Sequence, residues 1–278
     1  MQFGLHGINI GSYSSPALMI DVAQAAEAAG FDSVWTGEHT VLPERGWYMP
    51  AESRFLDSLV ALTYVAASTS TLKLATGVLI LPQHHPLELA KAIASLDHLS
   101  GGRVLAGFGV GYLQPEFQAL GVPFEERGAR TDEYLEAMLA IWSQEKPRYD
   151  GRYVSFKEVQ AYPRPLQQPS PPIIFGGSAL PALRRTLVSA HGWYGWGLDL
   201  EKTRQFITQF HQLEQEVTRP AHLGPLEISV HLRVPVTPAI VEQLDALGVQ
   251  RIVLSLPDPA EKPTALRFIE HASQTLFQ

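Results

Sequence analysis

The feature that most constrains the fold is a regular alternation of short apolar segments with longer amphipathic ones along the whole chain. One such unit runs from residue 74 to residue 116, where LATGVLILP leads through PLELAKAIASLDHLSGGR into VLAGFG and a glycine-rich tail, VGYLQPE. Short apolar runs bounded by Gly and Pro are typical of buried strands, and an apolar period near 3.6 indicates helices. Strands and helices that alternate in this way form parallel sheets.

Eight strands and eight helices can be traced in this pattern. Strands are expected at 3–10, 32–36, 72–79, 104–108, 173–175, around 193, 228–234 and 251–256. Helices are expected at 16–29, 56–67, 86–99, 130–142, 180–189, 199–217, 238–247 and 263–275. Eight units in 278 residues match a barrel better than an open Rossmann-like sheet, whose GxGxxG signature does not follow the first strand. We therefore predict an α/β fold, a (β/α)8 TIM barrel, with residues 1–278 in a single domain.

One connection is too long for an ordinary loop. The segment at about 145–172 is rich in Pro, Tyr and Gln and contains YDGRYVSF. We predict an insertion region here that carries a β-hairpin and lies over one rim of the barrel. We expect it to shape the substrate pocket together with the loop after the first strand.

Composition excludes several classes of partner. The net charge of −7 and the absence of a basic block argue against nucleic acid, because such binding depends on clustered Lys and Arg. The sequence has no run of eighteen apolar residues that could span a membrane. It also has no cysteine, and its first residues do not resemble an export signal, so a cytoplasmic location is expected. No HxH or HExxH spacing predicts a metal site.

In a TIM barrel, chemistry is carried by the loops that follow the strands. His39 follows the second strand, where an imidazole can transfer a proton near neutral pH. The alternative is a rim histidine bonded to a backbone carbonyl, and Glu38 is expected to point away from it. The other candidates at strand ends are His6, Asn9, Gly77, Val78, His84, His85, Gly109, Gly111, Tyr112, Gly176, Gly177 and Ser178.

Two glycine patterns have a functional and a structural interpretation. The Gly-Gly-Ser turn at 176–178 could cradle a phosphate at a helix start, or it could serve as a tight turn with Ser178 as the helix cap. Ser178 lacks the GxSxG context of a serine hydrolase. The alternate glycines at 107, 109 and 111 could let a flat ligand lie against the strand, or they could allow close packing at a bend.

Three tryptophans near strand ends also allow two interpretations. Trp35, Trp193 and Trp196 could wall an aromatic pocket. Packing is the more common role of tryptophan, and we expect it here.

Several segments together resemble the luciferase-like monooxygenase family, which includes flavin monooxygenases and deazaflavin-dependent oxidoreductases. They are AEAAGFDSVWTGEH, LATGVLILPQHHPLELAKAIASLDHLSGGR, FGVGYLQPEFQALGVPFEERGARTDE and PPIIFGGS. The resemblance covers nearly the whole chain, with the same order and spacing. It is closest to the branch that uses the deazaflavin coenzyme F420.

The resemblance implies a barrel whose C-terminal strand ends hold a flavin-type ring. Gly176, Gly177 and Ser178 match the turn that contacts the cofactor phosphate. Gly77-Val78 matches a non-proline cis peptide that supports the ring, with the residues at 110–112 as the wall beside it. His39 matches a histidine assigned to proton transfer, with Glu38 in the acidic position before it. His6 and Trp196 are expected in the substrate pocket.

Two departures from the family pattern limit what the resemblance implies. Val110 stands where the luciferase branch has an arginine that contacts the flavin phosphate, which argues against FMN. Tyr112 stands where sugar-phosphate dehydrogenases have a catalytic glutamate, so their substrate is not expected here. The third and fourth strand regions are most similar to the F420 branch, so F420 is the expected cofactor, with FMN as the alternative.

The resemblance implies an oxidoreductase that moves hydride between F420 and a small organic substrate. One alternative is an FMN-dependent monooxygenase that uses O2 and receives reduced flavin from a separate reductase. Another is a flavin-binding barrel without catalytic activity. A homodimer is expected from the family.

Overall fold

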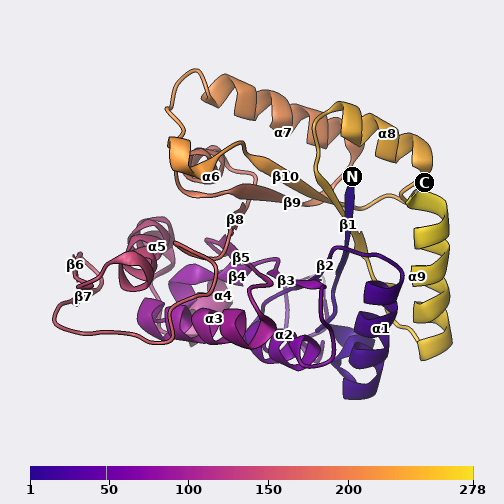
Figure 1. Ribbon diagram of the computed structural model, residues 1–278, viewed down its shortest axis with the longest axis horizontal. Helices are drawn as coiled ribbons and strands as arrows, with labels where there is room; N and C mark the ends of the chain where they lie inside the picture. Colours follow the sequence, from indigo (N-terminus) through magenta and orange to yellow (C-terminus); the bar gives the residue numbers. More distant parts are fainter. Residues whose placement is uncertain (48, 278) are drawn as a thin grey trace.

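The computed structural model describes residues 1–47 and 49–277, which form a closed barrel of eight parallel strands surrounded by helices (Figure 1). The barrel strands are β1 (Gln2–His6), β2 (Ser33–Thr36), β3 (Lys73–Thr76), β5 (Val104–Gly109), β8 (Ile173–Gly176), β9 (Gly192–Leu198), β10 (Glu227–Leu232) and β11 (Arg251–Ser255). They follow one another in sequence around the sheet, and β3 pairs with β5 to close it. The predicted (β/α)8 barrel is confirmed.

The outer helices are α1 (Pro16–Ala28), α2 (Ser58–Ala66), α3 (Pro86–Ser100), α5 (Arg127–Ser143), α6 (Leu180–Ser189), α7 (Leu200–Leu213), α8 (Pro238–Ala246) and α9 (Lys262–Leu276). Several begin with a proline in the first turn, where its missing N–H is not needed. Helix α9 packs beside α1 and brings the C-terminal residues back to the start of the chain (Figure 1). There Phe277 stacks on Phe3 with ring centroids 4.6 Å apart.

Alternation along the strands divides the core into two parts. On β2, Val34 packs among the residues of the outer core and Trp35 points into the barrel. The Trp35 ring stacks on Tyr194 at 4.5 Å, so the packing role expected for this tryptophan is confirmed. The barrel interior is filled by Trp35, Ala75, Leu105, Ile174, Tyr194 and Val253.

Two short elements differ from the sequence prediction. The strand expected at 72–79 is interrupted after Thr76, and a second strand, β4 (Leu79–Ile80), pairs with β5 beyond the interruption. The peptide bond between Gly77 and Val78 at this point is cis. A short helix, α4 (Gln114–Ala119), follows β5 in a segment for which the sequence indicated only a glycine-rich tail.

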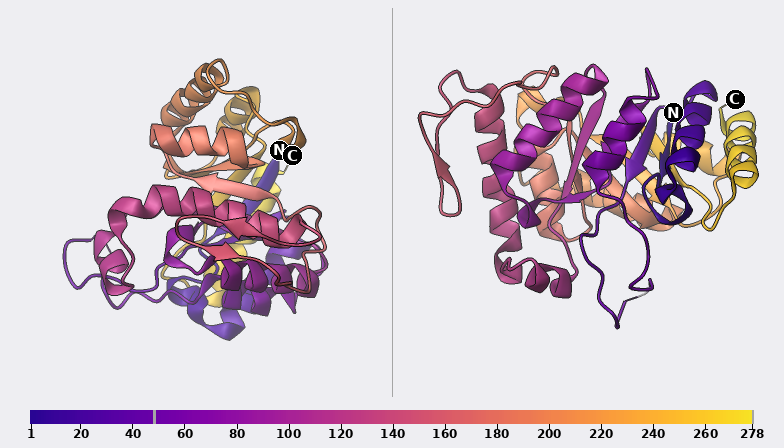
Figure 2. Two further views of the ribbon diagram at one scale, coloured as in Figure 1. Left: turned by 90° about the vertical axis from the view of Figure 1, so that its left-hand side faces the viewer. Right: turned by 90° about the horizontal axis from the view of Figure 1, so that it is seen from below.

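The insertion contains the predicted hairpin, formed by β6 (Tyr149–Asp150) and β7 (Ser155–Phe156). It packs along α5, where the Glu133 carboxylate accepts hydrogen bonds from the Tyr153 and Val154 amides. Because the insertion connects a helix to the next strand, its remainder lies at the N-terminal ends of the strands. The hairpin turn reaches the start of α5, where Arg152 donates to Glu126, and the end at which the strands terminate is bordered by residues 37–47 and 49–57 (Figure 2). The expectation that the insertion shapes the substrate pocket stays a prediction.

Among residues 1–47 and 49–277, no helix has the length and apolar character required to cross a bilayer.

Candidate active site at the C-terminal ends of the strands

The loop that connects β2 to α2 is described at residues 37–47 and 49–57 and carries His39. It is held by Asn9, which is fully buried just after β1. The Asn9 amide donates to the carbonyls of Gly37 at 2.8 Å and Leu56 at 2.6 Å, and its oxygen accepts from the Gly37 amide at 3.1 Å. Asn9 thus joins the two ends of the loop, a structural role for a residue that the sequence offered as a chemical candidate.

The His39 side chain is only 9% exposed and is surrounded by aromatic rings. The rings of Trp47, Phe55 and Tyr112 lie edge-on to it, with centroids at 4.7, 5.3 and 6.0 Å. The Nε2 atom of His39 lies 3.5 Å from the Tyr112 hydroxyl, and the Tyr112 side chain is largely exposed at the end of the barrel. The predicted wall residue and the predicted proton-transfer residue are therefore neighbours.

The other ring nitrogen of His39 faces a buried carboxylate. Nδ1 lies 3.2 Å from Oε2 of Glu116, which comes from the first turn of α4. The second oxygen of Glu116 accepts from the amides of Thr40 at 2.6 Å and Val41 at 3.3 Å. Burial alone would raise the pKa of Glu116, but the hydrogen bond and charge of His39 and the Thr40 amide bring it below its usual value.

Glu38 points away from His39, as its position next in the chain predicts. Its Oε2 accepts a hydrogen bond of 2.5 Å from the Ile80 amide, and its Oε1 lies 3.0 Å from Nε2 of His84. The carboxylate is only 6% exposed. Both oxygens are thus used to hold the chain on the far side of the Gly77-Val78 bond.

Val78 packs into space left by two glycines on neighbouring strands. A Cβ atom on Gly109 would lie 2.8 Å from Cγ2 of Val78, and one on Gly176 would lie 3.1 Å from Cγ1. A Cβ atom on Gly107 would meet the Thr76 carbonyl, and one on Gly111 would meet the Phe117 ring. The glycines at 107, 109 and 111 therefore allow close packing against Thr76, Val78 and Phe117.

The Gly176–Ser178 turn leads from β8 into α6. Gly177 has φ +116, a conformation that favours glycine, and it is exposed together with Ser178. Ala179, not Ser178, occupies the N-cap position, so the expectation of a serine cap is wrong. Within the first turn of α6, Pro181 has no amide hydrogen and the Ala182 amide donates to the Ala179 carbonyl at 2.8 Å, so an anion at this helix start would be bound by the amides of the turn before Pro181. The indole of Trp193 donates to the Gly177 carbonyl at 2.8 Å and fixes the turn from behind.

A second polar cluster lies on the opposite strands. Nδ1 of His6 lies 3.2 Å from the Tyr194 hydroxyl, whose pKa burial raises well above its usual value. Burial, with a smaller contribution from His231, lowers the pKa of His6 to about 3. His231 in turn has a pKa lowered to about 4 by burial and by Arg233. Both imidazoles are therefore neutral near pH 7.

Trp196 is 44% exposed and lies on this cluster. Its ring is parallel to that of His231, with centroids 5.4 Å apart, and the Arg233 guanidinium carbon lies 5.2 Å from its centroid. His6 contacts the same His231 ring at 5.5 Å. The two residues predicted for the substrate pocket, His6 and Trp196, are thus linked through His231, to which the sequence analysis gave no role. The only sequence signal that could have identified His231 was its inward-facing position on the strand expected at 228–234.

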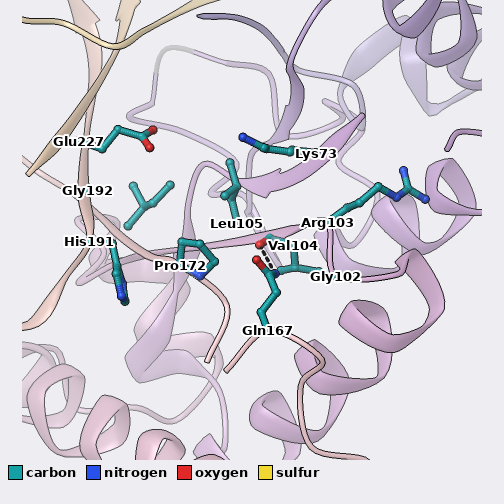
Figure 3. Close-up of a pocket in the computed structure, with 11 residues that line it drawn as sticks. Lys73, Gly102, Arg103, Val104, Leu105, Gln167, Pro172, His191, Gly192 and Glu227 are labelled. Carbon is teal, nitrogen blue, oxygen red and sulfur yellow. Dashed lines mark hydrogen bonds between the residues drawn. The ribbon is translucent and has the colours of Figure 1, made fainter. Parts of the chain in front are cut away.

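A cavity of about 190 Å³ lies at the opposite, N-terminal end of the barrel, between Arg103, Gln167 and His191 (Figure 3). Its polar side chains are engaged in structural contacts. The Arg103 guanidinium donates to several backbone carbonyls, and the Gln167 amide donates to Asp97 and to the Val104 carbonyl. The cavity is also remote from every candidate residue named above, so it is not the candidate active site.

The chain is similar to proteins of one family along most of its length. The family model described as luciferase-like monooxygenase matches residues 3–273. A Mycobacterium tuberculosis protein, Rv0953c, is 35% identical over 248 residues, which cover 85% of this chain and 86% of that protein. An F420-dependent glucose-6-phosphate dehydrogenase from Kineococcus radiotolerans is 34% identical over 167 residues, 59% of this chain and 48% of the dehydrogenase.

Solved structures share the fold across the whole chain. The monooxygenase RslO1 from Streptomyces bottropensis superposes with a TM-score of 0.80 at 22% identity, covering 100% of this chain and 99% of that one. An F420-dependent secondary alcohol dehydrogenase, solved with an F420–acetone adduct, gives a TM-score of 0.79 at 16% identity, with coverage of 99% and 98%.

Proposed function

This chain belongs to the luciferase-like monooxygenase family, and on that premise we propose that it transfers hydride between the deazaflavin coenzyme F420 and a small organic substrate. The observation that carries the proposal is the orientation of His39. One ring nitrogen faces a buried carboxylate, and the other is directed toward Tyr112 at the end of the barrel where the strands terminate. This arrangement suits a group that gives or takes a proton.

The deazaflavin, when bound, supplies the hydride acceptor or donor. In the direction of alcohol oxidation, Nε2 of His39 would accept the hydroxyl proton as the substrate gives up its carbinol hydride and becomes a carbonyl compound. In the reverse direction His39 returns the proton to the carbonyl oxygen. The chain contributes binding, orientation and this proton transfer.

The surroundings fit a cofactor with a phosphate and a flat ring. The exposed turn at Gly177 and Ser178 offers backbone amides at the start of α6, which suits an anion. We propose that Val78 supports the ring, with Val110, Gly111 and Tyr112 beside it. Glu38 then contributes to cofactor binding only indirectly. Its carboxylate contacts the Ile80 amide and the His84 imidazole, so it is not available to contact the cofactor itself.

The choice of F420 over FMN rests on the relatives and on one side chain. A relative with 34% identity is named for F420 dependence, and so is a solved structure of the same fold. Val110 supplies no positive charge where the luciferase branch has an arginine. The fold of the monooxygenase RslO1 keeps an FMN-dependent monooxygenase as the second candidate, with O2 as co-substrate and a separate reductase as partner.

Parallel titration of the purified protein with F420 and FMN, followed by tryptophan fluorescence, tests the coenzyme. We expect saturable binding of F420 at least tenfold tighter than that of FMN, followed by F420 reduction with a panel of secondary alcohols. Tight binding of FMN alone, with oxygen consumption when the flavin is reduced, would support the second candidate. Binding without turnover would indicate a non-catalytic flavin-binding barrel.

We also propose that residues 1–278 act as one domain and that the protein is a homodimer, which sedimentation of the purified chain tests.

A further inference from the structure

We propose that Glu116 is a positioning residue, which fixes the tautomer and the orientation of the His39 imidazole so that Nε2 faces the reacting atoms. The inference rests on the proposed function only in the role given to His39. The arrangement of the two side chains can be measured without coenzyme or substrate.

The geometry determines which ring nitrogen of His39 carries the proton. An ionised carboxylate can only accept hydrogen bonds, and Oε2 of Glu116 lies 3.2 Å from Nδ1. Nδ1 must therefore donate, which leaves the lone pair of the neutral ring on Nε2. That nitrogen lies on the Tyr112 side, toward the exposed end of the site.

Glu116 is itself held firmly enough to impose this arrangement. Its side chain is 1% exposed, and its second oxygen accepts from the Thr40 and Val41 amides. The edge-on rings of Trp47 and Phe55 restrict rotation of the imidazole. A buried carboxylate bonded to the far nitrogen of a histidine is the arrangement by which serine proteases orient their general base.

A competing explanation is that Glu116 only stabilises the loop through the Thr40 and Val41 amides. Two variants separate this explanation from positioning. Asn9→Ala removes hydrogen bonds that hold the same loop at Gly37 and Leu56, but it leaves the carboxylate beside His39 in place. Glu27→Gln controls for the loss of a carboxylate that accepts from backbone amides, because Glu27 accepts from the amides of Ser70, Thr71 and Leu72 at 2.6 to 3.0 Å on a different turn.

The first experiment is two-bond 1H–15N NMR of protein labelled with 15N-histidine, recorded without coenzyme at a pH where the ring is neutral. The His39 signals are assigned by their loss in His39→Asn. We expect a protonated Nδ1 and an unprotonated Nε2 in the wild type and in Glu27→Gln. In Glu116→Gln the amide NH2 can donate to Nδ1, so the proton should move to Nε2. A wild-type spectrum with the proton on Nε2 overturns the proposal, even if Glu116→Gln does not fold.

The second experiment measures steady-state kinetics with whichever coenzyme the titration identifies. Glu116→Gln should lower kcat by about 100-fold or more, with KM changed less than about threefold, because orientation of the base matters to the reaction rather than to binding. Glu27→Gln should stay close to the wild type. An equal loss of kcat in Asn9→Ala would show that Glu116 acts only by stabilising the loop. If neither coenzyme supports turnover, the proposed function fails while the NMR result still decides the role of Glu116.

Discussion

The carboxylate of Glu38 lies 3.0 Å from the imidazole of His84 and ties the loop after β2 to the turn after β4. Burial opposes the charged form of His84, but the hydrogen bond and charge of Glu38 outweigh it and raise the pKa of the imidazole above its usual value. The pair therefore holds the two segments that flank Val78 through an interaction that depends on pH.

The first prediction concerns this pH dependence. A histidine whose pKa is higher in the folded state stabilises the protein below its unfolded pKa of 6.5, and this contribution disappears as pH rises through the folded value. His84→Gln keeps a hydrogen-bond donor but removes the charge. We expect it to lower the free energy of unfolding by about 1 kcal/mol near pH 6 and by much less near pH 9. Urea denaturation at the two pH values measures the difference; an equal loss at both would contradict the assignment.

The second prediction concerns the loop at 37–57. Asn9→Ala leaves buried carbonyl and amide groups without their partner, each at a cost of about 1–3 kcal/mol. We expect the loop to detach locally, so that trypsin cleaves after Arg45 or Arg54 at least about tenfold faster. Gln24→Ala, which removes an exposed hydrogen bond to Ser68, is the control. Unchanged cleavage would show that Asn9 does not hold the loop.

The third prediction concerns the packing of Val78. A methyl group at Gly109 would lie 2.8 Å from Cγ2 of Val78, so Gly109→Ala must displace that side chain. We expect a loss of about 1–3 kcal/mol in the free energy of unfolding and weaker coenzyme binding. At Gly128 in α5 the added carbon would lie 3.7 Å from its nearest neighbour, Arg185, so Gly128→Ala serves as the control. Identical coenzyme affinity in the two variants would argue against Val78 as ring support.

The fourth prediction concerns acid stability. The pKa of His6 is lowered to about 3 from 6.5. Between about pH 3 and pH 6.5 the imidazole is therefore protonated in the unfolded chain but neutral in the folded protein. The contribution of His6 to the free energy of unfolding must therefore fall as pH drops below about 6.5. We expect His6→Gln to reduce the slope of unfolding free energy against pH between about 4 and 6 by up to about 1.4 kcal/mol per pH unit. Replacing the exposed His211 by Gln should leave the slope nearly unchanged. An unaltered slope in His6→Gln would show that the pKa of His6 does not differ between the folded and unfolded states over this pH range.

Much of the architecture could be predicted because its signals are local. Each barrel strand is a short apolar run between breakers, and each helix has an apolar period and, in several cases, a proline start. The same logic placed His39 at a strand end and turned Glu38 away from it. Local signals failed where packing decided the chain path: the strand expected at 72–79 breaks at Gly77-Val78, and the space left by Gly109 is filled by the Val78 side chain.

The sequence by itself determined the alternating units, the barrel, and which residues lie at the C-terminal strand ends. The sequence could not predict that His39 contacts Glu116, because 77 positions separate the two residues and no local pattern links them. The contact exists because β3 pairs with both β2 and β5, which brings the loop after β2 beside the helix after β5. Only the tertiary structure shows this pair, since closing the barrel is what places those segments together.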